Sequence, residues 1–493
     1  MRAQRRRALL ALAFLATACR HPKTAGGRVP GPGDALWLTA GLGPDQANAE
    51  SVMSRGGFSH LFLPAARVAR EGAGWRVEPA PAPPHATSAA PVVLVVASDS
   101  DFGADLSEGS EEAAAGAIEV GIHRALAQRS AFGRVEGIHL DLPFSPASSE
   151  KFGKFASSLK RRIPADLFLT CSLRFAPGEE EREALVRRLA EIDGFAAFVF
   201  GVGEDAAATP IATDALGKPW WACYAPGARG DWQDASGAHR ATLVEKHLMA
   251  LTNDPGVAMD NDLALHVDGV SGFLFRPTSA VDAAGAQLRE GDRVSFQVPL
   301  VSELLYRFGA DLVGRHLVRG RLIVLDGASD SERVFTLAAL SDVLLGRPVV
   351  PDLHVEVTPE ASSVRVRAEN LSVHASVVSR TTNWVEVEVA SGNIRDVQVG
   401  GFDRYEVFDP EGHPVTPGRA TRVRFYETLI SPREKIADGS ILLRAKPPLD
   451  CCRFRQHLIA ASGTEVAADW NAPPPRPTPT AAPKPKPRLK RVR

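Results

Sequence analysis

Short apolar runs alternate with amphipathic stretches along most of the chain, from residue 34 to about residue 350. The runs that predict strands lie at residues 35–40, 60–63, 92–97, 137–142, 167–173, 195–201, 220–224 and 272–276. Strands separated by helical crossovers are typical of a parallel sheet. Because eight such runs fit a closed ring, the pattern predicts an α/β fold with a (β/α)8 TIM-like barrel at residues 34–350.

Two of the helices between these runs are clearly marked. The first follows a Ser148-Ser149 cap, has Lys160 in its last turn, and carries apolar side chains at helical spacing: Phe152, Phe155, Leu159 and Ile163. The second begins at Glu179 and carries its apolar side on Leu185, Val186, Leu189 and Ile192. The second segment has acidic residues early and basic residues late, which suits the helix dipole.

The stretch from 280 to 347 holds more elements than eight barrel units need. Further apolar runs lie at 294–299 and 322–325, with helical patterns at about 302–308 and 332–345. One of these runs is therefore a candidate for the true eighth strand, and an open, doubly wound sheet is the alternative to a closed barrel.

From residue 351 onward the pattern changes to strands without helices. Alternating runs at 353–357, 364–367, 384–389, 422–425 and 441–443 predict a small antiparallel β-sandwich domain at residues 351–470. Residues 471–493 are rich in proline and then basic, which is typical of an extended stalk rather than a folded element.

The N-terminus resembles the export signal of a bacterial lipoprotein. Basic residues at positions 2, 5, 6 and 7 precede an apolar segment at 8–18, which is too short to span a bilayer, and Ala16-Thr17-Ala18 leads into Cys19. The resemblance implies removal of residues 1–18, acylation of Cys19, a linker at 19–33, and membrane attachment through the lipid. Arg20 after the cysteine implies an outer-membrane lipoprotein that faces the periplasm or the surface. Ordinary secretion is the alternative.

Composition excludes several classes of function. Lys plus Arg (57) nearly balance Asp plus Glu (58), which argues against a nucleic-acid partner. The remaining cysteines are too few and scattered for a disulfide scaffold or a zinc site, and the 13 histidines show no metal-ligand spacing. We therefore expect neither a metal nor another cofactor. Nothing in the sequence indicates an oligomeric state.

In a parallel barrel, functional groups gather at the C-terminal ends of the strands. That rule selects as candidates Asp99, Asp141, Arg174, Glu204, Trp220, Trp221 and Tyr224. Aromatic rings beside carboxylates suit the binding of sugars. A structural interpretation competes with this one, because Asp141 is equally suited to pairing with Arg174, and only one of the neighbouring Trp220 and Trp221 is able to point into the barrel.

Residues 135–143, with the sequence Val-Glu-Gly-Ile-His-Leu-Asp-Leu-Pro, are similar to the fourth-strand motif of the chitinase-like glycoside hydrolases of family 18. In that family alternate strand-end residues are acidic and a glutamate is the proton donor. Asp141 keeps one acid, His139 replaces another, and Pro143 stands at the donor position. Since proline cannot protonate a leaving group, the resemblance implies the scaffold without that mechanism.

Residues 34–201 also resemble a bacterial family known as domain of unknown function 3142. The resemblance rests on the run at 92–96, on residues 137–143, and on the following helix with Phe152, Phe155 and Leu159. It implies a glycoside-hydrolase-like barrel in a lipoprotein. The family's second acid and its cysteine are replaced here by Pro143 and Phe144.

Together these features predict a lipid-anchored cell-envelope protein that binds glycan, such as peptidoglycan, without cleaving it. One alternative is an active glycoside hydrolase that uses Asp141 with Glu204 or Asp99 as its carboxylate pair. The other is a structural envelope or assembly protein whose barrel has no small ligand.

Overall fold

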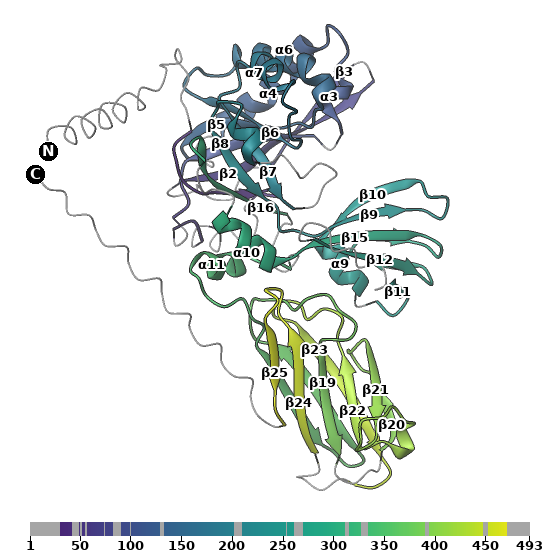
Figure 1. The fold of residues 1–493 in the computed structure, drawn as a ribbon. Helices are drawn as coiled ribbons and strands as arrows, with labels where there is room; N and C mark the ends of the chain where they lie inside the picture. The colour runs from purple at the N-terminus through teal and green to yellow at the C-terminus, as the bar shows by residue number, and fades with distance from the viewer. Residues whose placement is uncertain are drawn as a thin grey trace, which may run out of the picture.

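The computed structural model describes residues 30–41, 49, 52–54, 57–72, 74–81, 90–98, 100–128, 133–201, 210–252, 254–260, 270–310, 315–326, 334–389, 394–446 and 452–470. Figure 1 shows a barrel, an antiparallel sheet that projects from its side, and an elongated β-domain. Three of the candidate residues, Cys19, Asp99 and Glu204, lie outside the described residues, as does the basic tail.

Within the described residues, eight parallel strands form a closed barrel. Strand β1 pairs with β2 on one side and with β16 on the other, so the sheet has no free edge between them. In sheet order the strands are β1 (Ala35–Leu38), β16 (Val318–Leu325), β8 (Trp220–Tyr224), β7 (Gly194–Phe200), β6 (Phe168–Leu173), β5 (Val135–Asp141), β4 (Val92–Ala97) and β2 (His60–Glu71). The predicted fold class is confirmed, and the open sheet is excluded.

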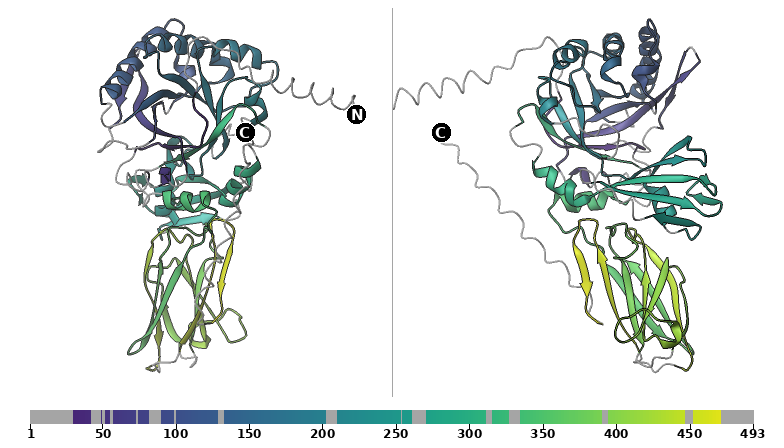
Figure 2. Two further views of the ribbon diagram at one scale, coloured as in Figure 1. Left: turned by 90° about the vertical axis from the view of Figure 1, so that its left-hand side faces the viewer. Right: turned by 45° about the vertical axis from the view of Figure 1, so that its right-hand side comes forward.

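The described helices of the barrel pack on its outside (Figures 1 and 2). They are α3 (Phe102–Asp105), α4 (Glu111–Ala127), α6 (Ser149–Lys160), α7 (Arg182–Arg188) and α8 (Pro210–Asp214), with the 3-10 turn η2 (Pro146–Ser148) before α6. The predicted stripe of Phe152, Phe155 and Leu159 is fully buried against the barrel. Strand β3 (Gly74–Pro79) extends the sheet by pairing antiparallel with β2.

The prediction that residues 272–276 form a barrel strand is wrong. They belong to β12 (Val270–Pro277), in a separate antiparallel sheet inserted between β8 and β16, while 322–325 lies in the true eighth strand, β16. The burial patterns give the reason: β15 (Arg293–Pro299) alternates buried and exposed residues, whereas β7 is buried throughout. The other inserted elements are β9 (Arg229–Gln233), β10 (His239–Val244), α9 (Glu245–Thr252), β11 (Val257–Asp260), β13 (Val281–Ala283) and β14 (Ala286–Leu288).

The C-terminal domain is an antiparallel β-sandwich. One sheet contains β17 (Leu353–Pro359), β18 (Ser363–Asn370), β23 (Lys435–Leu443) and β20 (Ile394–Gln398). The other contains β21 (Arg404–Phe408), β22 (Arg422–Tyr426), β19 (Trp384–Val389), β24 (Cys452–Ile459) and β25 (Glu465–Ala468), and the 3-10 turn η4 (Pro417–Arg419) lies before β22. Inward side chains of both sheets, such as Val366 and Val387, form one core.

Helices α10 (Val301–Ala310) and α11 (Leu337–Leu344) lie between the barrel and the sandwich (Figure 1). The hydroxyl of Thr336 donates to the carbonyl of Val373 at 3.1 Å, and Nε2 of His374 lies 3.1 Å from Oδ2 of Asp342. These contacts tie the sandwich to α11.

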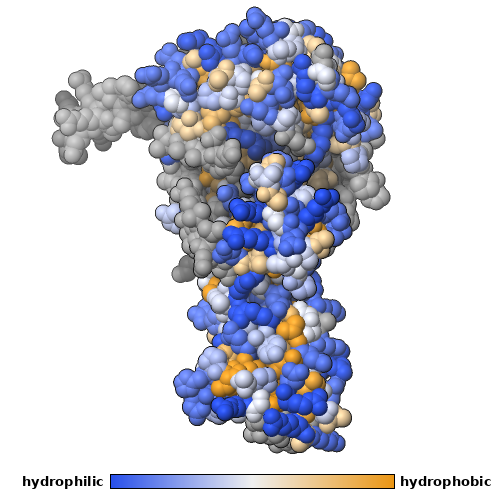
Figure 3. Space-filling view, turned by 90° about the vertical axis from the view of Figure 1, so that its right-hand side faces the viewer, coloured by the Kyte–Doolittle hydropathy of each residue, from blue (hydrophilic) through white to orange (hydrophobic). Residues whose placement is uncertain are grey.

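Hydrophobic residues gather on the sandwich in the surface view of Figure 3. No helix among the described residues has the length and apolarity to cross a membrane.

Candidate functional site

The inside of the barrel is a packed core rather than a channel. Aromatic side chains from several strands fill it, including Trp37, Phe62, Phe168 and Trp221. The indole of Trp221 lies edge-on to Phe62, with 5.3 Å between ring centroids, and its Nε1 donates to the carbonyl of Gly33 at 3.2 Å. Any ligand of the barrel therefore has to bind above this core, at the ends of the strands.

A chain of hydrogen bonds runs from this core to the C-terminal end of the barrel. His139 on β5 is fully buried, with Nδ1 3.0 Å from Oγ1 of Thr170 and Nε2 3.1 Å from Oγ of Ser172. Ser172 donates to Oδ1 of Asp141 at 2.6 Å, and Nη2 of Arg174 donates to the same oxygen at 2.7 Å. The structural pairing of Asp141 with Arg174, weighed from the sequence, is present.

These contacts fix the tautomer of His139. An ionised carboxylate only accepts hydrogen bonds, so the Ser172 hydroxyl donates its hydrogen to Asp141. The same hydroxyl oxygen then accepts a hydrogen bond from Nε2 of His139. The ring therefore carries its proton on Nε2, and Nδ1 accepts from Thr170. Burial lowers the pKa of His139 to about 4, which keeps the ring neutral.

Opposing effects act on the carboxyl of Asp141. Burial alone raises its pKa, but the charge of Arg174 and the hydrogen bonds from Ser172 and Arg174 outweigh burial, so the pKa lies below its ordinary value. Asp141 is thus an anion, and its second oxygen, Oδ2, has no hydrogen-bond partner among the described residues. The Nε group of Arg174 is buried and is also without a partner in the described part of the chain.

A second ion pair stands at the same end of the barrel. Asp326, which follows β16, accepts from Oγ1 of Thr39 at 2.8 Å and lies 3.4 Å from Nη2 of Arg229. Both pairs lie near enough to the buried Cys223 for their charges to act on its thiol, whose pKa burial raises. We call Asp141, Arg174, Arg229 and Asp326 the mouth cluster.

Sequence reasoning missed half of this cluster. Arg229 and Asp326 are 97 positions apart, because the inserted sheet separates β8 from β16. Asp326 follows an apolar run that the sequence analysis left ambiguous, and its strand-end position was the signal that would have found it.

The aromatic candidates do not wall an open groove. Trp220, Trp221 and Tyr224 all have 0% exposure. Trp221 points into the barrel, as alternation allows for one of the two neighbours, whereas Trp220 and Tyr224 pack in the layer outside it. The Nε1 group of Trp220 donates to Asp214 at 3.1 Å. Their expected contact with a ligand is incompatible with complete burial, which leaves them no surface to offer.

Of the three carboxylates named in the hydrolase alternative, the structure describes only Asp141. Glu204 and Asp99 lie outside the described residues. The carbonyl of Pro143, the residue that the family 18 resemblance aligns with a proton donor, accepts from the backbone nitrogen of Gly103 at 2.9 Å. Within the described residues there is no group of three or more histidine, cysteine, aspartate or glutamate side chains suited to a metal ion.

Comparison with known proteins gives structural similarities only. No protein family model and no curated protein matches the chain, so the resemblance to domain of unknown function 3142 stays a prediction. A spore cortex-lytic enzyme of Bacillus cereus, SleL, is similar at 12% identity and a TM-score of 0.35, over 64% of this chain and 74% of that one. A family 18 chitinase from Cycas revoluta has 11% identity and a TM-score of 0.35, over 63% and 97% of the two chains. A family 30 endoxylanase from Clostridium papyrosolvens has 10% identity and a TM-score of 0.33, over 83% and 98%. The barrel itself is established by its own strand pairing.

Proposed function

We propose that this chain is a lipid-anchored protein of the bacterial cell envelope whose barrel binds glycan at the mouth cluster without cleaving it. The observation that carries the proposal is the state of Asp141. It is held as an anion by Ser172 and Arg174, and it keeps one oxygen unpartnered among the described residues.

Sugar hydroxyls suit such a pair because each hydroxyl both donates and accepts a hydrogen bond. Oδ2 of Asp141 supplies an acceptor, and the part-exposed side chain of Arg174 supplies donors. The side chains retain 14% and 34% exposure, so both reach the surface. Two arginines balance two aspartates in the cluster, which favours an uncharged stretch of glycan over a polyanion.

Cleavage of a glycosidic bond needs a carboxylic acid that is protonated at working pH. Asp141 is unsuited to that task, because its pKa lies below the ordinary value rather than above it. Pro143 offers no proton at the donor position. These two residues support binding over hydrolysis.

The envelope location rests on the signal-like N-terminus and on Cys19. A protein tethered there by lipid faces peptidoglycan, which makes peptidoglycan the first glycan to test. The resemblance to domain of unknown function 3142 likewise implies a glycoside-hydrolase-like barrel in a lipoprotein.

Retention of the purified mature protein on insoluble peptidoglycan and on chitin tests the proposal. We expect wild-type protein to be retained and Asp141→Asn to lose about tenfold or more in affinity, because the charged acceptor and the anchor of Arg174 are both lost. Glu388→Gln, on the sandwich, is the matched control and should bind as wild type does. Far-ultraviolet circular dichroism verifies that each variant is folded.

Equal retention of wild type and Asp141→Asn would exclude the mouth cluster as the binding site. Retention of neither on any glycan would favour the structural alternative, in which the barrel has no small ligand.

A further inference from the structure

The inserted sheet carries a hollow at the end of β9 that lies away from the barrel. Strand β9 begins at Arg229, beside Asp326 of the mouth cluster, and runs to Gln233 and the turn into β10. The hollow lies at that far end and has a volume of about 570 Å³, which is within the range of about 300–1,000 Å³ for small-molecule sites. Figure 1 shows the sheet projecting away from the barrel.

One aromatic side chain borders this hollow. Trp232 on β9 is half-buried and packs against the core of the inserted sheet, yet it also lines the hollow. Its Nε1 donates to Oδ2 of Asp292 at 3.0 Å, which fixes the orientation of the indole. A fixed aromatic surface at the edge of a hollow is suited to the apolar face of a sugar ring.

Polar groups from three chain segments surround the indole. Asp292 is only 6% exposed, and its Oδ2 also accepts from the backbone nitrogen of Arg289 at 2.9 Å. Its other oxygen, Oδ1, has no hydrogen-bond partner in the described residues, so it keeps its capacity to accept a hydrogen bond. Gln287, at the centre of β14, adds an amide to the lining.

Arg240 completes the lining through a local irregularity of β10. The register of β9 and β10 shifts between His239 and Ala241, so Arg240 is the extra residue of a β-bulge. Bulges of this kind redirect a side chain. The guanidinium of Arg240 lies 2.6 Å from Asp234, which also lines the hollow, and it remains 58% exposed.

We propose that this hollow is a second saccharide-binding site, which accepts a short oligosaccharide against Trp232 with hydroxyl contacts from Asp292, Gln287 and Arg240. The chemistry of an oriented indole beside acceptor and donor groups is what recognises a sugar. The site is separate from the mouth cluster, so it does not depend on the proposed function of the barrel. Two sites on one chain hold a polymeric glycan more firmly than one.

Fluorine NMR of the full mature chain labelled with 5-fluorotryptophan tests this site directly. The Trp232 signal is identified by its absence in Trp232→Phe, and N-acetylchitotriose and cellotriose are the probes. We expect at least one probe to shift this signal in a saturable way. Arg240→Ala should weaken that binding by about tenfold, while Asp141→Asn should leave it unchanged.

The matched control is Arg276→Gln, which removes a half-exposed arginine paired with Asp260 elsewhere on the same sheet. It should bind as wild type does. A Trp232 signal that neither probe moves would overturn the proposal, and so would equal affinities of Arg240→Ala and Arg276→Gln. A shift that disappears in Asp141→Asn and persists in Arg240→Ala would assign the binding to the barrel mouth alone.

Discussion

Asp141 shows how neighbours decide what a strand-end acid does. The position is one where a barrel enzyme places its chemistry, yet Ser172 and Arg174 both bind the same oxygen of the carboxylate. Beneath it, the buried His139 contacts two hydroxyls, which makes it a neutral link in a hydrogen-bonded chain. These contacts agree with the proposal that Asp141 and His139 orient neighbouring groups and transfer no proton.

Titration of His139 is the prediction at this scale. Burial lowers its pKa from 6.5 to about 4, so the folded state favours the neutral ring. Its contribution to stability is fully present above pH 6.5 and is lost as the pH falls through about 4. Long-range ¹H–¹⁵N NMR, assigned with His139→Gln, should show the proton on Nε2 and no titration above about pH 5.

A His139 ring that titrates near pH 6.5 would contradict the effect of its burial. A proton on Nδ1 would contradict the direction of the hydrogen bond between Nε2 and Ser172.

Strand-level features account for what the sequence predicted well. Barrel strands buried on both faces appear as continuous apolar runs, and alternation assigned one of Trp220 and Trp221 to the interior. The inserted sheet was mistaken for barrel because a short apolar run such as 272–276 carries no mark of its partner strands. The sequence could not predict the hydrogen bond between Thr39 and Asp326 either, because that contact depends on the pairing of β1 with β16 that closes the barrel.

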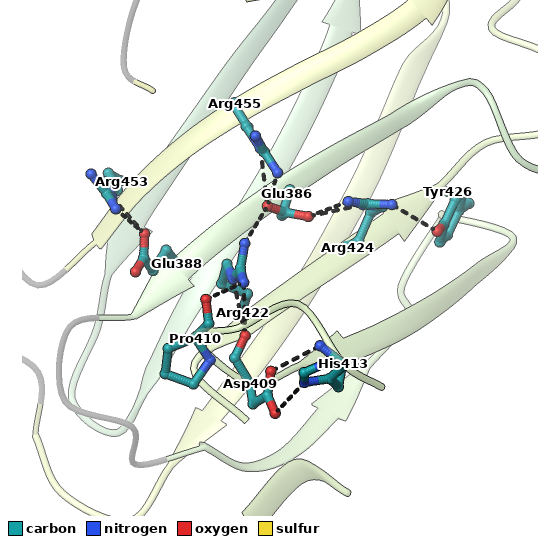
Figure 4. A network of polar contacts seen from close by, with 10 residues as sticks. All are labelled: Glu386, Glu388, Asp409, Pro410, His413, Arg422, Arg424, Tyr426, Arg453 and Arg455. Atoms are coloured by element: carbon teal, nitrogen blue, oxygen red, sulfur yellow. Dashed lines mark hydrogen bonds and ion pairs between the residues drawn. The ribbon is translucent and has the colours of Figure 1, made fainter. Parts of the chain in front are cut away.

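One face of the sandwich is covered by charged side chains of neighbouring strands, as Figure 4 shows. Glu386 on β19 is 1% exposed and accepts from Nη2 of Arg424 at 2.6 Å and from Nη2 of Arg455 at 2.7 Å. Arg422 lies 3.8 Å from it. Glu388, two residues along, has the more exposed Arg453 as its partner. Strand β19 therefore carries two glutamates that each pair with arginine, a buried one, Glu386, and a more exposed one, Glu388.

The two glutamates should differ strongly when neutralised. We expect Glu386→Gln to destabilise the sandwich by about 3 kcal/mol, because it leaves partly buried arginines without their counter-charge. Glu388→Gln should cost less than about 1 kcal/mol, as an exposed pair does. Hydrogen exchange of peptides from β19, β22 and β24 in the full chain measures both effects. Equal protection in the two variants would show that burial of Glu386 has no energetic weight.

The whole molecule combines a barrel, an inserted sheet and a sandwich, with its N-terminal end leading into β1 and its C-terminal end leaving from the edge strand β25 (Figures 1 and 2). Cys19 lies 15 residues before Asp34. A fully extended linker of that length reaches at most about 50 Å, so a lipid at Cys19 would keep the barrel close to the membrane surface.

Membrane attachment through Cys19 is the prediction at this scale. Acyl chains contribute about 0.8 kcal/mol per buried methylene, and residues 8–18 are too short to span the bilayer. Cys19→Ala should therefore move the protein from the membrane fraction to the soluble periplasmic fraction. The control Cys223→Ala, which changes a buried thiol, should stay with the membrane. Membrane retention of Cys19→Ala would exclude the lipid anchor.

The central claim is that the barrel binds glycan and does not cleave it. The most direct measurement is the release of reducing ends from peptidoglycan and chitin oligomers over an extended incubation with wild-type protein, with Asp141→Asn in parallel. The account predicts retention of glycan by the wild type and no release above the protein-free blank, because the ionised Asp141 and Pro143 provide no proton donor. Release by the wild type that is abolished in Asp141→Asn would contradict the account and establish a hydrolase.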